Sequence, residues 1–410
     1  MVVPGLAVVK SGSQSTTLAF IPLLKGGSNS STRLVFLQAG QPRGTYRCYD
    51  LRRQSTGLAG MAVRFKKVIG RAAASVGIAI TIGLAAVVGF LTYTGQPAGS
   101  ERIRFDGFIL LPKRGVINVL DYLTLNGDDL FVTGASSGSV FKVVLKPGQD
   151  IANGVVSELR GEPRVHGVAV VPSQDVAFVT RSEVNTVDAF NPSTLQLIGR
   201  IKVSDDPDAI LYDQPLNLIY VANGEAGVGT LIDPKSRTVV ATIPLGGKPE
   251  FPALDPESGL LYQNLNDTNS IAALDLARRT VVGRWPINPC VGPTGVAIDA
   301  KHRRLFSVCS KNATLIVFDM DQHRVLTSLP VGARPDSVAY DPSLQKIYTA
   351  GLSGTMTVVR QNTADSYQVT DTLYTHFAAH TLAVDVASHQ IFVGYASLFI
   401  QPRIAVFTAR

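Results

Sequence analysis

Polar side chains that could do chemistry recur at one position of a long repeat in the C-terminal three quarters of the chain. These side chains are His166, Asp208, Glu250, Thr294, Asp336 and His380. In the first copy of the repeat, which aligns poorly, the same position falls on Asn118 or Asp121. Carboxylates and imidazoles at one point could hold a divalent cation, or act as acid and base on a lactone or similar substrate.

The repeat that places these residues is marked by an aliphatic residue followed by Tyr or Phe. Seven copies have aromatic residues 47, 42, 42, 44, 42 and 44 residues apart. They are Leu130-Phe131, Ala177-Phe178, Ile219-Tyr220, Leu261-Tyr262, Leu305-Phe306, Ile347-Tyr348 and Ile391-Phe392. Each unit contains four β-rich runs separated by Gly, Pro, Asn and Asp, which is typical of strands and turns. Four antiparallel strands per unit predict the blade of a β-propeller.

The number of units predicts an all-β, seven-bladed β-propeller of four-stranded antiparallel blades over residues 101–410. Six blades are expected at about 119–156, 165–203, 207–246, 249–288, 293–332 and 335–375. The last unit, from about 379 to 410, has room for only three strands. We expect residues 102–111 to supply its outer strand and so to leave no open sheet edge.

Innermost strands line the channel of a propeller, and the polar repeat position opens each of them. We therefore expect the six candidate residues to converge at the wide mouth of the channel. The functional interpretation is a site for a ligand or a partner, with catalysis as an alternative. The simpler interpretation is a rim of polar side chains that face water.

One repeat carries a family signature. Ile219-Tyr220-Val221-Ala222-Asn223 resembles the Tyr-Val-Thr-Asn motif, with Ala in place of Thr, and the chain from 101 to 410 is similar to bacterial YVTN-type β-propeller repeat proteins. Other copies depart from the motif, as in Phe178-Val179-Thr180-Arg181. The resemblance implies an exported or surface protein. Some proteins of this type bind other macromolecules, and the wider seven-bladed class includes lactonases and lyases.

The residues before the propeller are of a different kind. Residues 1–60 show no sustained periodicity and are interpreted as a disordered leader or an over-extended start. Within residues 61–99, four basic residues (Arg64, Lys66, Lys67 and Arg71) precede an uncharged apolar run, residues 72–91. A helix of that length spans about 30 Å. We expect a signal-anchor or signal peptide, a body exported to the periplasm or to the outer face of the cytoplasmic membrane, and membrane contact through 72–91.

The charge divides at the same boundary. Formal net charge is +7 overall, but residues 1–100 hold eleven Lys/Arg and one acidic residue. The remaining 27 Lys/Arg and 30 Asp/Glu give the body 27 − 30 = −3. Affinity for nucleic acid comes mainly from clustered basic side chains, so a nucleic-acid partner is not expected.

Two of the three cysteines are expected on one face of the fifth blade. Cys290 precedes its inner strand, and Cys309 ends its second strand. An oxidising compartment would favour a Cys290–Cys309 disulfide, and two separate buried thiols are the alternative.

These features favour an exported, non-enzymatic binding scaffold with a protein or small-molecule partner at the propeller mouth. The alternatives are a lactonase or lyase that uses the channel carboxylates and histidines, and a nucleic-acid binder. No cofactor is expected, although a divalent cation is compatible with the mouth residues.

Overall fold

The structure is a computed structural model that describes residues 7–11, 14–18, 97–145, 155–161 and 164–410, in two units, 1–82 and 83–410. In the first unit, β1 (Ala7–Ser11) pairs with β2 (Gln14–Leu18) as an antiparallel hairpin. The apolar helix predicted over 72–91 lies outside the described residues. Among the residues that are described, no helix is both long and apolar enough to cross a bilayer.

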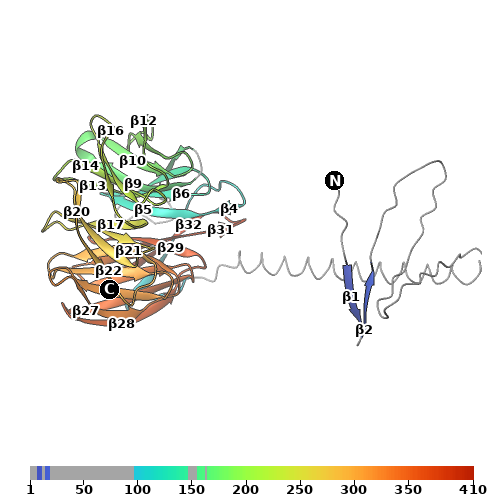
Figure 1. The fold of residues 1–410 in the computed structure, drawn as a ribbon. Helices are drawn as coiled ribbons and strands as arrows, with labels where there is room; N and C mark the ends of the chain where they lie inside the picture. The colour runs from blue at the N-terminus through green and yellow to red at the C-terminus, as the bar shows by residue number, and fades with distance from the viewer. Residues whose placement is uncertain (1–6, 12–13, 19–96, 146–154, 162–163) are drawn as a thin grey trace, which may run out of the picture. The chain divides into compact units, whose positions relative to one another are not determined.

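The second unit contains seven four-stranded antiparallel sheets, as the repeat predicts (Figure 1). Blade 1 consists of β5 (Leu120–Asn126), β6 (Asp129–Gly134), β7 (Ser139–Val144) and β8 (Val155–Arg160). Its outer strand therefore continues beyond the predicted limit near 156. Blade 2 consists of β9 (Val165–Val171), β10 (Val176–Arg181), β11 (Thr186–Phe190) and β12 (Leu197–Lys202), with a 3-10 turn, η2 (Pro172–Gln174), between its first two strands.

The next four blades follow the predicted bounds to within two residues. Blade 3 consists of β13 (Pro207–Asp213), β14 (Leu218–Asn223), β15 (Val228–Asp233) and β16 (Thr238–Pro244). Blade 4 consists of β17 (Pro249–Leu254), β18 (Leu261–Leu265), β19 (Ser270–Asp275) and β20 (Thr280–Pro286). Blade 5 consists of β21 (Pro293–Asp299), β22 (Arg304–Cys309), β23 (Thr314–Asp319) and β24 (Arg324–Pro330). Blade 6 consists of β25 (Pro335–Asp341), β26 (Lys346–Gly351), β27 (Thr355–Thr363) and β28 (Ser366–Tyr374).

Blade 7 closes the ring with a strand from the start of the propeller. Its strands are β29 (Ala379–Asp385), β30 (Gln390–Tyr395), β32 (Arg403–Ala409) and β3 (Ile103–Leu110). The register runs from Ile103 opposite Ala409 to Leu110 opposite Arg403. The outer strand predicted over 102–111 is thereby confirmed. Each inner strand also contacts the next, and β29 contacts β5.

The repeated aromatic residues explain why the blades pack against each other. All seven are almost fully buried: Phe131, Phe178, Tyr220, Tyr262, Phe306, Tyr348 and Phe392. Tyr220 of blade 3, for example, packs with Leu261 and Leu274 of blade 4. Burial of an aromatic side chain contributes roughly 1.5–3 kcal/mol. The signature found in the sequence is therefore the packing surface between blades.

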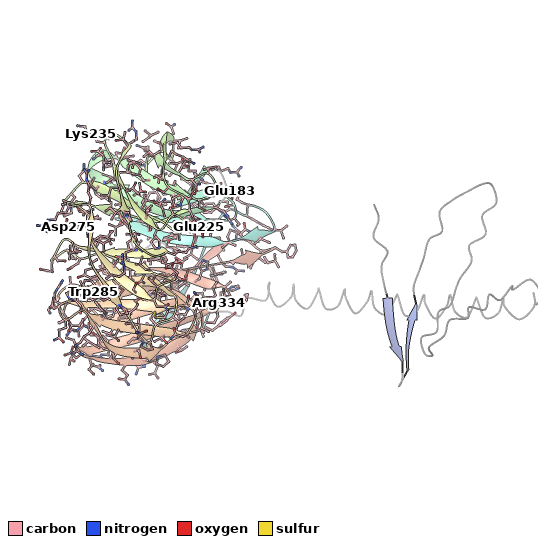
Figure 2. All side chains as sticks on the ribbon, viewed as in Figure 1. Glu183, Glu225, Lys235, Asp275, Trp285 and Arg334 are labelled. Carbon is pink, nitrogen blue, oxygen red and sulfur yellow. A yellow bond between two sulfur atoms is a disulfide. The ribbon has the colours of Figure 1, made fainter. Side chains whose placement is uncertain are left out.

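The strand order defines two faces. The face on which every inner strand begins is called the mouth face. It also carries the turn after each second strand and the crossover after each outer strand. Figure 2 shows Glu183, Glu225 and Arg334, which belong to such turns and crossovers, on the side that carries two short strands, β4 (Ile117–Asn118) and β31 (Ser397–Leu398). Lys235 and Asp275 lie toward the other side.

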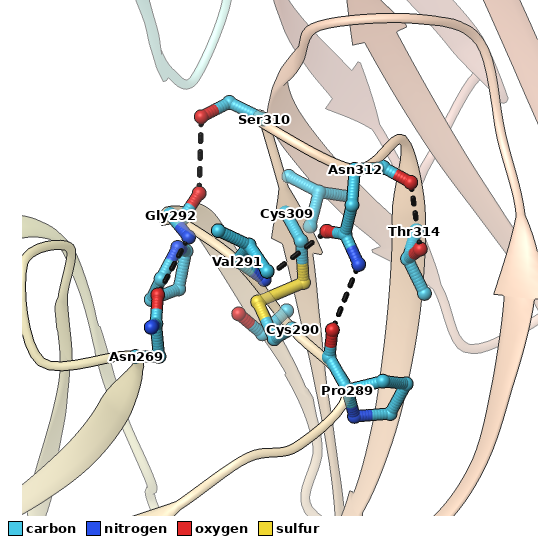
Figure 3. The surroundings of a disulfide bond; sticks show 12 residues. Asn269, Pro289, Cys290, Val291, Gly292, Cys309, Ser310, Asn312 and Thr314 are labelled. Carbon is cyan, nitrogen blue, oxygen red and sulfur yellow. Dashed lines mark hydrogen bonds between the residues drawn. A yellow bond between two sulfur atoms is a disulfide. The ribbon is translucent and has the colours of Figure 1, made fainter.

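Cys290 and Cys309 form a disulfide at the mouth face of blade 5 (Figure 3), with an S–S distance of 2.04 Å and a Cα–Cα distance of 5.4 Å. The surrounding backbone is hydrogen-bonded by Asn312, whose Nδ2 donates to the carbonyl of Pro289 at 2.7 Å and whose Oδ1 accepts from the Val291 N–H at 3.1 Å. The bond joins the crossover that enters blade 5 to the second strand of that blade.

Removing apolar volume from the closing strand should weaken the whole ring. Ile103 is fully buried in the blade 6–blade 7 core, whereas Leu110 on the same strand is 44% exposed. Ile103→Ala should lower the free energy of unfolding by roughly 2–5 kcal/mol, as is usual for a buried aliphatic truncation. Denaturant unfolding measures this change, with Leu110→Ala as the control. Equal, small effects of the two variants would contradict the closure.

The disulfide predicts a specific chemical behaviour. Alkylation of the unfolded protein without reductant should leave Cys290 and Cys309 unmodified, and alkylation after reduction should add one group to each, because only free thiolates react. Peptide mass spectrometry reads both states. Full labelling of both cysteines before reduction would show two separate thiols.

Candidate functional site

The candidate residues occupy equivalent places in the ring. Each is the second residue of its inner strand: His166 in β9, Asp208 in β13, Glu250 in β17, Thr294 in β21, Asp336 in β25 and His380 in β29. In blade 1 that place belongs to Asp121 in β5. Asn118 lies instead in β4, where its Oδ1 accepts a hydrogen bond from the Arg114 N–H at 3.0 Å.

Asp121 lies at the centre of a chain of charged contacts. Its Oδ2 is 2.5 Å from His166 Nδ1, and its Oδ1 is 3.7 Å from His380 Nε2. His166 also lies 3.5 Å from Asp208 Oδ1 and contacts Ser182 Oγ at 2.9 Å through Nε2. Blades 7, 1, 2 and 3 are thus linked across the mouth by two imidazoles and two carboxylates.

The other three predicted residues stand apart from this chain. Thr294 is buried, and its hydroxyl donates to the carbonyl of Pro335 at 3.1 Å, so it ties blade 5 to blade 6. Glu250 and Asp336 make no side-chain hydrogen bond or ion pair with any described residue. They contribute carboxylates that only a ligand or water could satisfy.

The electrostatics of the mouth follow from burial and from crowding of like charges. Burial would lower the pKa of the two histidines, but Asp121, together with Asp208 for His166 and Asp336 for His380, raises each to about 9. These histidines in turn lower the pKa of Asp121 to about 2, against the effect of its burial. At neutral pH the trio is therefore ionised.

The remaining carboxyl groups shift in the opposite direction. Burial, with repulsion from Asp208 and Asp336, raises the pKa of Glu250 to about 8. Burial also raises the pKa of Asp208 to about 6, despite the nearby His166, and that of Asp336 to about 6, despite the nearby His380. The carboxyl groups of Asp208, Glu250 and Asp336 therefore repel each other, and a proton on Glu250 relieves part of that repulsion.

An aromatic pair lies directly below the charged residues. Tyr122 follows Asp121 and Phe251 follows Glu250, and their rings stack with centroids 4.7 Å apart and planes at 21°. Because β5 and β17 belong to blades 1 and 4, the pair extends across the ring. Inspection of the sequence missed both residues, although their place immediately after the polar position was the available signal.

A pocket of about 540 Å³ opens beside the cluster, along blades 2, 3 and 4. Its lining is almost entirely charged: Arg164, His166, Ser182, Asp206, Asp208, Glu225, Lys248 and Glu250. Lys248 Nζ contacts Glu225 Oε1 at 2.7 Å at the rim. Several of these side chains come from crossovers and turns, and two of them, Asp206 and Lys248, directly precede the Pro that opens an inner strand.

Asp121, His166 and Asp208 are spaced closely enough to share a cation, since one ligand atom from each lies within 4.8 Å of the others. A metal would bind the neutral imidazole, however, and the elevated pKa of His166 means that a proton would have to leave first. An ammonium group needs no such step. It would meet the carboxylates of Asp208, Glu250 and Asp336 as a hydrogen-bond donor with compensating charge.

Comparisons with known proteins support the fold and leave the family open. No protein-family model matches the chain, and no curated protein sequence matches it. Among solved structures it is similar to Kuenenia stuttgartiensis hydrazine synthase, with a TM-score of 0.61 and 18% sequence identity over 72% of this chain and 97% of that one. A likeness at that identity establishes a shared β-propeller architecture.

The raised pKa of Glu250 predicts how stability depends on pH. Its pKa rises from 4.5 to about 8 on folding, so between these values only the unfolded protein releases the proton and stability falls as pH increases. Glu250→Gln removes this contribution. The variant should gain stability relative to the parent between pH 5 and pH 8, as measured by denaturant unfolding at each pH.

The control for this comparison is Glu257→Gln, at an exposed turn of the same blade. Its side chain is exposed and lies outside the mouth, so Glu257→Gln should not reproduce the gain seen with Glu250→Gln. A Glu250→Gln effect that is the same at pH 5 and pH 8 would contradict the elevated pKa.

Proposed function

We propose that this chain is an exported β-propeller of the YVTN type that binds, at its mouth, the cationic group of a small molecule or a partner protein. The observation that carries the proposal is the convergence of four half-buried carboxylates from four blades at the mouth, of which two, Glu250 and Asp336, have no hydrogen-bond or ion-pair partner among the described residues. Propellers commonly act as interaction scaffolds, which is consistent with this assignment.

The chemistry of the ligand follows from the charge of the site. Asp121 and Asp208 both contact His166, and Asp121 also contacts His380, so Glu250 and Asp336 are the groups left to receive a positive charge. A cation beside them would lower the pKa values that burial and mutual repulsion have raised. The Tyr122–Phe251 pair offers an aromatic surface below the carboxylates, which suits an alkylammonium group.

Export is supported by two independent features. The basic residues Arg64, Lys66, Lys67 and Arg71 before the apolar run 72–91 orient a signal-anchor with the body outside. The Cys290–Cys309 disulfide suits an oxidising compartment such as the periplasm. We therefore assign the propeller to the outer face of the cytoplasmic membrane.

A lactonase or lyase is the second candidate function. It is favoured by carboxyl groups whose pKa values are spread within one pocket, about 6 for Asp208 and about 8 for Glu250. A pair of this kind could serve as base and acid near neutral pH. Nucleic acid fits poorly, because the mouth is rich in carboxylates.

Calorimetric titration of the full chain in detergent tests the binding proposal. The probes are methylammonium, a lysine-rich peptide, Ca²⁺, Mn²⁺ and Zn²⁺. The double variant Glu250→Gln/Asp336→Asn should weaken ammonium or peptide binding at least tenfold. The matched double variant Glu257→Gln/Asp385→Asn, at the opposite face, should bind like the parent.

The outcomes separate the alternatives. Binding of Ca²⁺, Mn²⁺ or Zn²⁺ alone would assign the site to a divalent cation. No binding of any probe, together with turnover in a lactone and lyase screen that the mouth double variant abolishes, would assign it to catalysis. Equal binding by both double variants would overturn the mouth site.

A further inference from the structure

Blade 7 departs from the repeat at the mouth face. Its turn between the second and third strands, 396–402, and the crossover that leaves its outer strand, 111–119, are each the longest of their kind in the ring. The two segments pair with each other through β4 and β31, with Ser397 opposite Asn118 and Leu398 opposite Ile117. We call residues 111–119 and 396–402 the blade 7 lobe.

The lobe exposes apolar side chains. Val116 is 50% exposed, Ile117 is 57% exposed and Phe399 is 47% exposed. Phe399 has a positive φ of 61°, which is costly for an aromatic residue. Hydrogen bonds hold it in place, because its N–H donates to the carbonyl of Val116 at 2.7 Å and its carbonyl accepts from Lys113 Nζ. The lobe thus fixes an aromatic side chain where it meets solvent.

The charge of the lobe is opposite to that of the body. It contains Lys113 and Arg114 and neither Asp nor Glu, whereas residues 101–410 carry a net −3. Arg114 is neutralised by Glu158, to which its Nε donates at 2.9 Å. Exposed apolar side chains beside a lysine, with no acidic residue in the same segment, are the pattern of a surface that enters the interface of an anionic bilayer.

The entry of the chain into the propeller lies close to this lobe. The N–H of Ala98 donates to the carbonyl of Tyr374 at 3.2 Å, at the mouth-face end of β28. From there the contacts are continuous, since His376 stacks on Tyr395 at 4.1 Å and the Ala396 N–H donates to the carbonyl of Ala378. The apolar run of the sequence ends at Leu91, and seven residues reach at most about 25 Å.

We propose that the blade 7 lobe docks on the surface of the bilayer, with Val116, Ile117 and Phe399 entering the headgroup region and Lys113 near anionic phosphates. This inference rests on the membrane anchor of the proposed function, because residues 72–91 keep the lobe within reach of lipid. The pocket opens on the same mouth face as the lobe, but blades 2, 3 and 4 line it and blade 7 does not.

Quenching of tryptophan fluorescence by brominated lipids tests the docking. Two variants of the full chain, Ile117→Trp and Val239→Trp, are reconstituted in vesicles of dibrominated phosphatidylcholine with phosphatidylglycerol. Val239 is 41% exposed on β16, near the end that faces away from the mouth. Trp285 is the only native tryptophan and gives both variants the same background.

Ile117→Trp should be quenched at least twofold more than Val239→Trp, and more strongly with phosphatidylglycerol than without it. Flotation of the protein with vesicles and equal quenching of the two variants would overturn the lobe while leaving the anchor in place. Failure to float would overturn both. Cross-linking of position 117 between two copies, without quenching, would reassign the lobe to self-association. Unchanged thermal unfolding of each variant checks its fold.

Discussion

Pairing of β3 with β32 is the interaction on which the rest of the structure depends. Seven blades leave the last sheet one strand short, and an unpaired third strand would expose a row of backbone donors and acceptors. β3 fills that edge from the opposite end of the propeller, and Ile103 becomes fully buried between blades 6 and 7. Only in the closed ring does β29 meet β5, which brings His380 to Asp121.

Closure has an electrostatic consequence. Equivalent positions of seven inner strands are brought to one axis, so carboxylates that are far apart in the chain become neighbours in a partly dry environment. The negative charges of these carboxylates are compensated in different ways. Asp121 contacts two protonated histidines, whereas Glu250 retains its proton near neutral pH. Carboxylates that have no partner in the free protein can receive a positive charge. Packing between the blades offsets the free-energy cost of holding these carboxylates close together.

Differences between the repeats give the mouth face two regions with different chemistry. Blades 2, 3 and 4 keep short turns and line the pocket, whereas blade 7 carries the longest turn and the longest crossover and forms an apolar, basic lobe. Repetition therefore accounts for the seven blades and for the ring of polar side chains. The two surfaces with distinct chemistry arise where loops differ between repeats.

Much of this molecule could be read from the sequence, because a β-blade repeats its physical requirements. The buried aromatic residue of each second strand, such as Tyr220, must be apolar in every copy, and so the seven blades, their bounds and the closing strand were predictable. The second residue of each inner strand was predictable for the same reason.

The sequence could not choose between Asn118 and Asp121, because the lobe lengthens the crossover before β5 and obscures the alignment. Nor could it separate Thr294, which bonds to Pro335, from its charged equivalents, since hydrogen bonds between blades depend on the packed ring. Tertiary structure alone decided three features: the pairing of the carboxylates, the Tyr122–Phe251 stack and the β4–β31 lobe. Each depends on distances between segments that are far apart in the chain, and no local sequence pattern contains those distances.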